Sequence, residues 1–237
     1  ELFNEKVAAI IGPVIMAEPA AQEAQDHGVP IITLTQKGNI TSIGDWVFRN
    51  FLTPVAQVKA LVFFAVEELN LNRFAILYPD ENYGKTFMNL FWDELLESGG
   101  KVVGVESYRP EQTDFMDPIK KLVGIYYQVP EDLKPEVSSD LDENLQQTDE
   151  ESRENELEKA EEDEEPVPIV DFDAVFIPDA PGKVGQIVPQ LAYFDVKDVF
   201  LLGTNLWHSD SLIKIAHQYV QGALMTDGFF PQNTSPQ

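Results

Sequence analysis

The chain has 237 residues, of which 43% are hydrophobic, so it is long enough for one large domain or two small lobes. Its 41 acidic and 16 basic residues give a net charge of −25, and this field disfavours nucleic acid and anionic membrane surfaces as partners. The lack of cysteine excludes a disulfide framework, a thiolate metal site and a cysteine nucleophile, and the lack of an apolar run of about 20 residues excludes a membrane-spanning segment.

Strands and helices are expected to alternate along the first 130 residues. The continuous apolar run VAAII is typical of a strand buried on both faces. The expected strands are 7–11, 30–34, 73–78 and 101–106, and the expected helices are about 19–27, 54–69, 84–98 and 114–123. The apolar stripe of the second helix is expected to consist of Val55, Val58, Leu61, Val62, Ala65 and Leu69.

A strongly acidic segment interrupts this pattern between residues 131 and 165. It holds 17 acidic and 3 basic residues, a net charge of −14, and no aromatic residue. Such a segment cannot bury enough apolar surface to offset its ordering entropy, so we expect a disordered or loosely helical insertion within one domain. Its stretch DLDENLQQTDEE resembles a calcium-binding loop, but Leu145 stands where the sharp turn needs glycine, so a solvated acidic run explains it better.

The alternating pattern resumes after the acidic segment. Strands are expected at 173–177, 198–202 and near 222–230, and helices at 181–192 and 210–219. Repeated β-α units of this length predict an α/β fold with doubly wound parallel sheets. In such sheets the ligand crevice lies at the carboxyl ends of the strands, where the stretch VFLLGTNLW brings Thr204, Asn205 and Trp207.

Several stretches together resemble a known family. The pieces IIGP, GVPIIT and AILYPDENYG make the chain similar to the type I periplasmic-binding fold of the leucine/isoleucine/valine-binding proteins, the extracellular ligand-binding receptor family. The resemblance covers nearly the whole chain apart from the acidic segment. The stretch LLGTNLW resembles one branch of that fold, the periplasmic-binding-like domains of penicillin-binding-protein activator lipoproteins.

The resemblance implies two lobes with a cleft between them. Residues 1–53 would form part of lobe one, 54–130 the first part of lobe two, 131–165 the acidic insertion, and 166–237 the second part of lobe two and the start of a return to lobe one. The family's opening strand, helix and second strand, and its closing helices, have no counterpart in these residues. The fold is therefore expected to be incomplete at both ends.

The resemblance also implies ligand-binding positions in lobe one. In amino-acid-binding relatives the loop after Gly-Pro presents small hydroxyl residues and helix N-terminal N–H groups to the ligand carboxylate. The corresponding positions here are Ile15, Met16 and Ala17, which carry no hydroxyl, and Glu18 adds a negative charge. This departure weighs against branched-chain amino-acid binding. A second, polar loop is expected to face the ligand with Thr33, Thr35, Gln36 and Lys37.

In lobe two the resemblance places an aromatic and polar wall on the cleft. Its residues are Tyr83, from the family's Tyr-Gly motif, and then Asp179, Thr204, Asn205 and Trp207, which follow two strands. Structural alternatives stay open for these positions. The tyrosine could mark a helix entry, the aspartate could cap the next helix, the tryptophan could pack between lobes, and the threonines of lobe one could satisfy backbone groups.

The leading functional hypothesis is a non-enzymatic extracytoplasmic solute-binding protein of the branched-chain amino acid receptor type. It would hold a small polar or amphipathic ligand, such as an amino acid, between its lobes. The alternative is an envelope lipoprotein domain that binds and activates a peptidoglycan synthase without a small ligand. A catalytic role is disfavoured because no nucleophile with a base, phosphate loop or metal cluster can be recognised. We expect no cofactor or metal, and a periplasmic or envelope location with lipid anchoring of the full-length protein left open.

Overall fold

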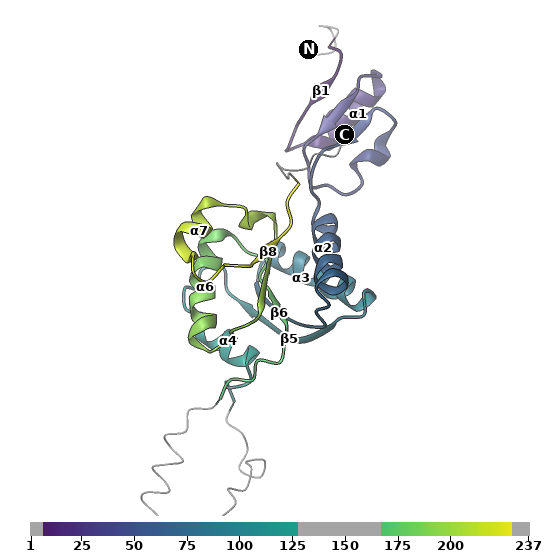
Figure 1. Ribbon diagram of the computed structural model, residues 1–237. Helices are drawn as coiled ribbons and strands as arrows, with labels where there is room; N and C mark the ends of the chain where they lie inside the picture. Colours follow the sequence, from purple (N-terminus) through teal and green to yellow (C-terminus); the bar gives the residue numbers. More distant parts are fainter. Residues whose placement is uncertain (1–6, 128–166, 229–237) are drawn as a thin grey trace, which may run out of the picture.

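The computed structural model describes residues 7–127 and 167–228, so the expected acidic insertion lies outside the described residues. Within them the chain forms two β-sheets, each with its own helices (Figure 1). The small sheet has the strand order β1-β2-β3, and the large sheet has the order β5-β4-β6-β7-β8. Every strand pairing is parallel, which confirms the predicted α/β class.

The small sheet and its helices form what we call the small lobe. Its strands are β1 (Ile10–Ile11), β2 (Ile31–Thr33) and β3 (Val47–Arg49), and its helical elements are α1 (Ala17–Asp26) and the 3-10 turn η2 (Ile40–Ile43). The sequence did not predict β3, because three residues between polar turns give too short an apolar pattern. The first strand is also shorter than the expected 7–11.

Only one face of the small sheet is covered by the described elements. Helix α1 packs a stripe of buried alanines against Ile31 and Val47. On the other face Ile11, Ile32 and Phe48 lie in register, and Ile11 and Phe48 are 75% and 51% exposed.

The large sheet and its helices form the large lobe. Its strands are β4 (Arg73–Pro79), β5 (Lys101–Tyr108), β6 (Ala174–Phe176), β7 (Phe200–Gly203) and β8 (Leu224–Met225). Its helical elements are α2 (Pro54–Phe63), the π-helical turn η3 (Phe64–Glu68), α3 (Asn82–Glu97), α4 (Met116–Leu122), α6 (Pro181–Tyr193), the 3-10 turn η5 (Asn205–Trp207) and α7 (Asp210–Ala216). Strand β6 pairs with β4, so residues on both sides of the acidic segment share one sheet.

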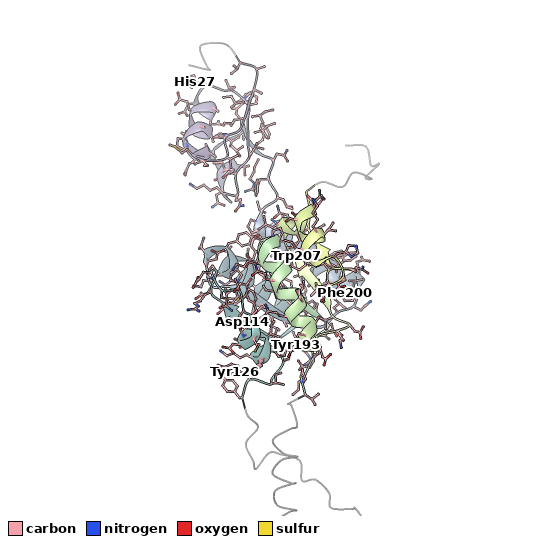
Figure 2. All side chains as sticks on the ribbon, turned by 90° about the vertical axis from the view of Figure 1, so that its left-hand side faces the viewer. His27, Asp114, Tyr126, Tyr193, Phe200 and Trp207 are labelled. Carbon is pink, nitrogen blue, oxygen red and sulfur yellow. The ribbon has the colours of Figure 1, made fainter. Side chains whose placement is uncertain are left out.

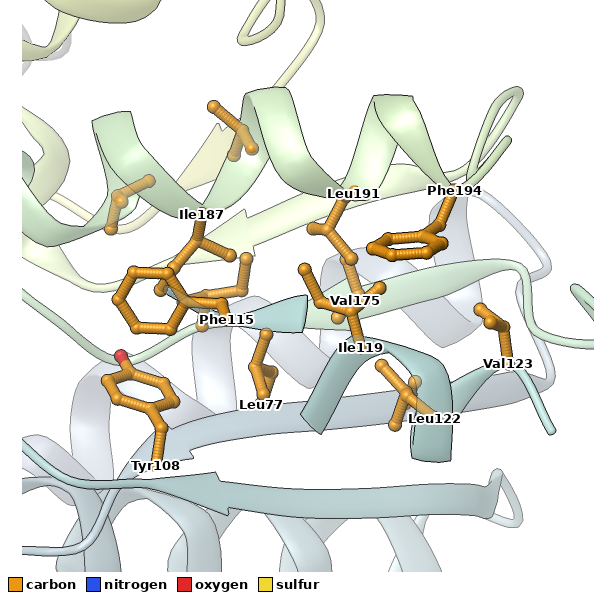
Figure 3. Packing of buried hydrophobic residues seen from close by; sticks show 14 of the residues in the cluster. Leu77, Tyr108, Phe115, Ile119, Leu122, Val123, Val175, Ile187, Leu191 and Phe194 are labelled. Carbon is orange, nitrogen blue, oxygen red and sulfur yellow. The ribbon is translucent and has the colours of Figure 1, made fainter. Parts of the chain in front are cut away.

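Successive residues of β4 face two different cores. Phe74 and Ile76 pack in a core with α2 and α3, whereas Ala75 and Leu77 pack in a core with α4, α6 and α7. All four are fully buried. Burial on both faces explains why this strand reads as an unbroken apolar run. Figure 3 shows the second core, where Leu77 lies among residues of α4 and α6.

Helix α2 buries a stripe that differs from the expected one. Val58, Leu61 and Val62 are buried as expected, but Val55 is 46% exposed and Gln57 is only 4% exposed. Residues four apart share a helix face, so Gln57 lies one turn before Leu61 on the buried side. The expectation for Val55 was therefore wrong, and a polar residue occupies the core face.

Two chain segments emerge side by side from the large lobe on the side of the small lobe (Figure 1). The first crossover, residues 50–53, joins β3 to α2, and the exit segment, residues 226–228, follows β8. A Cβ added at Gly228 would lie 3.8 Å from the Cβ of Leu52, so the two segments are in contact. Over residues 7–127 and 167–228, no helix combines the length and apolar character needed to cross a membrane.

Candidate ligand-binding site

Two hydroxyl groups meet at the carboxyl ends of β4 and β7. Tyr83 lies in the first turn of α3, and its hydroxyl oxygen is 2.9 Å from Oγ1 of the buried Thr204, which follows β7. Burial raises the pKa of Tyr83, the hydrogen bond with Thr204 partly offsets this rise, and the charge of Asp179 adds to it. The three predicted residues Tyr83, Thr204 and Asp179 are therefore neighbours at one edge of the large sheet.

A second tyrosine supports Asp179. The hydroxyl of Tyr108, the last residue of β5, donates a hydrogen bond of 2.6 Å to Oδ2 of Asp179. The other carboxylate oxygen, Oδ1, accepts the backbone N–H of Ala180 at 2.6 Å. Burial, followed by the charge and hydrogen bond of Asp179, raises the pKa of Tyr108 far above its usual value, so this phenol keeps its proton. Ala180, not Asp179, is the N-cap of α6, so the capping alternative does not describe this aspartate.

Sequence reasoning missed Gln57, which holds the loop after β7. Its Oε1 accepts the backbone N–H of Asn205 at 2.9 Å and the hydroxyl of Thr226 at 3.3 Å. Its Nε2 donates to the carbonyl oxygen of Leu52 at 3.3 Å. The available signal was an amide residue one turn before Leu61, on a helix face whose other members are apolar.

Trp207 belongs to the core of the large lobe and not to an exposed edge. It is 3% exposed and packs in the core with α6 and α7. Its ring lies directly on Gly203, where an added Cβ would be 2.1 Å from Cδ2 of the indole. The indole Nε1 has no hydrogen-bond partner among the described residues. Figure 2 shows Trp207 at the end of the large lobe nearer the small lobe, and Tyr193 at the opposite end.

In the small lobe both threonines of the second predicted loop form hydrogen bonds with backbone groups of the same lobe. The Thr33 hydroxyl donates to the carbonyl of Phe48 at 2.9 Å, and Oγ1 of Thr35 accepts the N–H of Lys37 at 3.3 Å. Both threonines therefore have the backbone role that the sequence left open, while Gln36 is exposed. The ammonium of Lys37 forms an ion pair with Glu18 of α1.

The first predicted loop is apolar and exposed. Ile15 is 81% exposed and Met16 is 74% exposed, while Ala17 is buried against the small sheet. Met16 has a left-handed backbone, with φ 57°, and is the N-cap of α1, but it gives no side-chain cap to the helix. This arrangement leaves first-turn N–H groups of α1 without a cap from this side chain.

In the described parts of the chain, no group of three or more His, Asp or Glu side chains is placed to hold a metal ion. A surface depression of about 170 Å³ is lined by residues 214–219, and none of the predicted site residues belongs to it.

Comparison with known proteins gives one family match and a set of structural matches. A family model described as periplasmic binding protein matches residues 1–124. No curated protein matches the chain.

Three solved structures illustrate the likeness. A putative branched-chain amino acid ABC transporter from Rhodospirillum rubrum has a TM-score of 0.66 at 15% identity, over 97% of this chain and 54% of that chain. The leucine binding protein LivK from Thermotoga maritima has a TM-score of 0.57 at 20% identity, over 99% of this chain and 55% of that chain. The substrate binding protein LivJ from Streptococcus pneumoniae, in complex with isoleucine, has a TM-score of 0.51 at 21% identity, over 91% and 49%.

These matches concern the fold. They confirm the predicted two-lobed type I periplasmic-binding architecture with parallel sheets. This chain spans about half the length of the structures that it matches.

Proposed function

This chain belongs to the periplasmic binding protein family, and from that premise we propose that it is a non-enzymatic, extracytoplasmic solute-binding protein. The solute is a small amphipathic amine of the amino-acid class, held between the two lobes. Hinge closure of the lobes around the solute would report occupancy to a transporter or sensor.

The main support for this proposal is that Asp179 is buried without a cationic partner among the described residues. It is 8% exposed and is the one buried carboxylate among the described residues. Its oxygens accept hydrogen bonds from Tyr108 and Ala180, although a carboxylate can accept about four. Within the described residues it forms no ion pair with a lysine, arginine or histidine. A buried charge needs a partner, and a ligand ammonium would supply one.

The small lobe offers surfaces that suit the apolar side chain and the carboxylate of such a ligand. Ile15 and Met16 offer exposed apolar surface at the start of α1. The N-terminus of a helix attracts a carboxylate through its free N–H groups. The negative charge of Glu18, which weighed against this from the sequence, is compensated by its ion pair with Lys37.

The test is a calorimetric titration of the chain with leucine, isoleucine and phenylalanine, and with 4-methylpentanoate, which lacks the amine. We expect the amino acids to bind and the deaminated analogue to bind at least about tenfold more weakly, because it leaves Asp179 without a cation. Asp179→Asn should weaken the amino acids by a similar factor.

The matched control is Asp93→Asn, which changes an exposed aspartate of α3. It should leave binding unchanged. Equal affinities of wild type and Asp179→Asn for leucine would refute the role of this carboxylate. Absence of binding by every amine tested would refute the solute-binding proposal in this form.

The alternative role, as an envelope domain that binds a peptidoglycan synthase, stays a prediction. The exposed apolar surface at Ile15 and Met16 would also suit a protein partner. Binding of a purified synthase with no response to small amines would favour it.

A further inference from the structure

Gln57 lies where three parts of the large lobe come together. It is in the first turn and a half of α2, immediately after the first crossover, and it is 4% exposed. The helix begins with Thr53 as its N-cap, whose hydroxyl accepts the N–H of Ala56 at 3.2 Å. This cap marks the start of the helix, and position 57 lies on its buried side.

The orientation of the Gln57 amide is determined by its partners. The backbone N–H of Asn205 can only donate, so it must face Oε1, and the carbonyl of Leu52 can only accept, so it must face Nε2. Both acceptor sites of Oε1 are filled, one by Asn205 and one by the hydroxyl of Thr226. The amide cannot rotate by 180° without losing these bonds.

The three partners belong to three functionally different segments. Leu52 is in the first crossover and Thr226 begins the exit segment, and these two segments are in contact. Asn205 opens η5, the loop after β7, and the preceding residue, Thr204, is bonded to Tyr83. One buried side chain therefore joins both segments that face the small lobe to the loop at the proposed ligand edge.

We propose that Gln57 is a positioning residue that couples the β7 loop to the first crossover, which joins the lobes, and to the exit segment packed against it, so that occupancy at Thr204 or Asn205 biases the angle between the lobes. The coupling to ligand rests on the proposed function, whereas the restraint of the lobes does not. Because the N–H of Asn205 is taken by Gln57, a ligand would have to use another group of this residue, such as its side-chain amide.

The experiment measures the distance between the lobes directly. The chain has no cysteine, so Asp45→Cys in the small lobe and Glu97→Cys in the large lobe, both exposed positions, allow a spin-label pair to be attached without background labelling. We expect Gln57→Leu to broaden the distance distribution in the absence of ligand. Hydrogen exchange of the Asn205 amide should accelerate about tenfold, as the loss of one buried hydrogen bond implies.

Two further variants test the bonds of Gln57 separately and keep the proposal testable if Gln57→Leu does not fold. Thr226→Val, the milder change, removes only the bond to the exit segment. Gln57→Glu places a carboxylate oxygen against the Leu52 carbonyl and so breaks the bond to the first crossover, but it also buries a charge at a 4% exposed position. Thr226→Val should broaden the distribution less than Gln57→Leu, because it leaves the bonds of Gln57 to Leu52 and Asn205 in place. Gln22→Leu, an exposed glutamine in α1, and Thr86→Val, an exposed threonine in α3, are the matched controls.

A structural role alone would lower the thermal midpoint and leave the distance distribution unchanged. That result, in any folded variant of Gln57, would overturn the proposal. If no amine binds the wild-type chain, but Gln57→Leu broadens the distribution of inter-lobe distances as expected, the proposed function fails and the restraint by Gln57 stands. If amines bind and narrow the wild-type distribution but not that of Gln57→Leu, both hold.

Discussion

Two tyrosine hydroxyl groups form hydrogen bonds at the edge of the large sheet where we propose that the ligand binds. Tyr83 and Tyr108 both direct their phenols at polar partners that lie just after strands. Tyr108 is 3% exposed and donates to a buried carboxylate, so its neutral form is favoured in the folded protein. This preference links folding to pH in the alkaline range.

The predicted consequence is a loss of stability above about pH 10, the usual pKa of tyrosine. There the unfolded chain releases the Tyr108 proton while the folded protein retains it, so the unfolded state binds fewer protons. The unfolding free energy should therefore fall by up to about 1.4 kcal/mol per pH unit from this residue. Below about pH 10 the contribution is fully present.

Urea unfolding between about pH 9.5 and about pH 11.5 measures this slope. Tyr108→Phe should make the fall of the unfolding free energy with pH shallower, by the amount that corresponds to about one proton released on unfolding. Tyr127→Phe, at a 73% exposed tyrosine, is the control for loss of a phenol. An identical slope in wild type and Tyr108→Phe would contradict the prediction.

Sequence reasoning found the site residues that lie next to a local apolar pattern, and it missed those whose partners are far away in the sequence. Thr204 follows an apolar strand directly and Asp179 lies three residues after one, so the topology rule for parallel sheets points to both. Tyr108 ends a strand whose apolar pattern stops three residues earlier, at Val105. Gln57 lies in a helix about 150 residues before its partner Asn205. Such long-range pairing leaves no local pattern. Trp207 carried a strong aromatic signal, but only packing could show that its ring covers Gly203.

At the scale of elements, apolar runs predicted most strands of the large sheet because both of its faces are buried. The small sheet was predicted less completely, since its three-residue β3 depends on pairing with β2 and not on its own apolar run. Strand order was also beyond local patterns: β6 joins β4 a hundred residues away, in part through Asp173.

Asp173 gives an element-scale prediction. Its Oδ2 accepts the backbone N–H groups of Asn72 and Arg73 at 2.8 and 2.9 Å, which fixes the start of β4 against β6. Asp173→Ala should lower the unfolding free energy by about 2 kcal/mol, because two backbone donors lose a charged acceptor. Urea unfolding at neutral pH measures the change.

The neighbouring Asp171 provides the contrast. Its side chain is half exposed and forms an ion pair with the partly exposed Arg73. Asp171→Ala should cost less than about 1 kcal/mol, as exposed pairs usually do. Equal losses in the two variants would show that the backbone hydrogen bonds of Asp173 do not organise the strand.

At the scale of the whole molecule, the chain leaves and re-enters the large lobe at one place. The N–H of Ile169 donates to the carbonyl of Val123 at 2.9 Å, and a Cβ on Gly124 would lie 3.6 Å from the Ile169 side chain. The two flanks of the acidic segment are thus already held together by the described residues. A short connection is therefore sufficient to join them.

We therefore predict that a Gly-Ser linker of about six residues can replace residues 131–165 without loss of the fold. Removing this segment changes the net charge from −25 to −11. A shorter loop costs less closure entropy, so the unfolding free energy should rise by up to about 1 kcal/mol, and lower self-repulsion acts in the same direction. Thermal unfolding by circular dichroism measures the change, with a scrambled acidic segment of the same composition as control. If deletion lowers the stability but scrambling does not, the acidic charge itself stabilises the large lobe. If both changes lower the stability, the native acidic sequence packs on the large lobe.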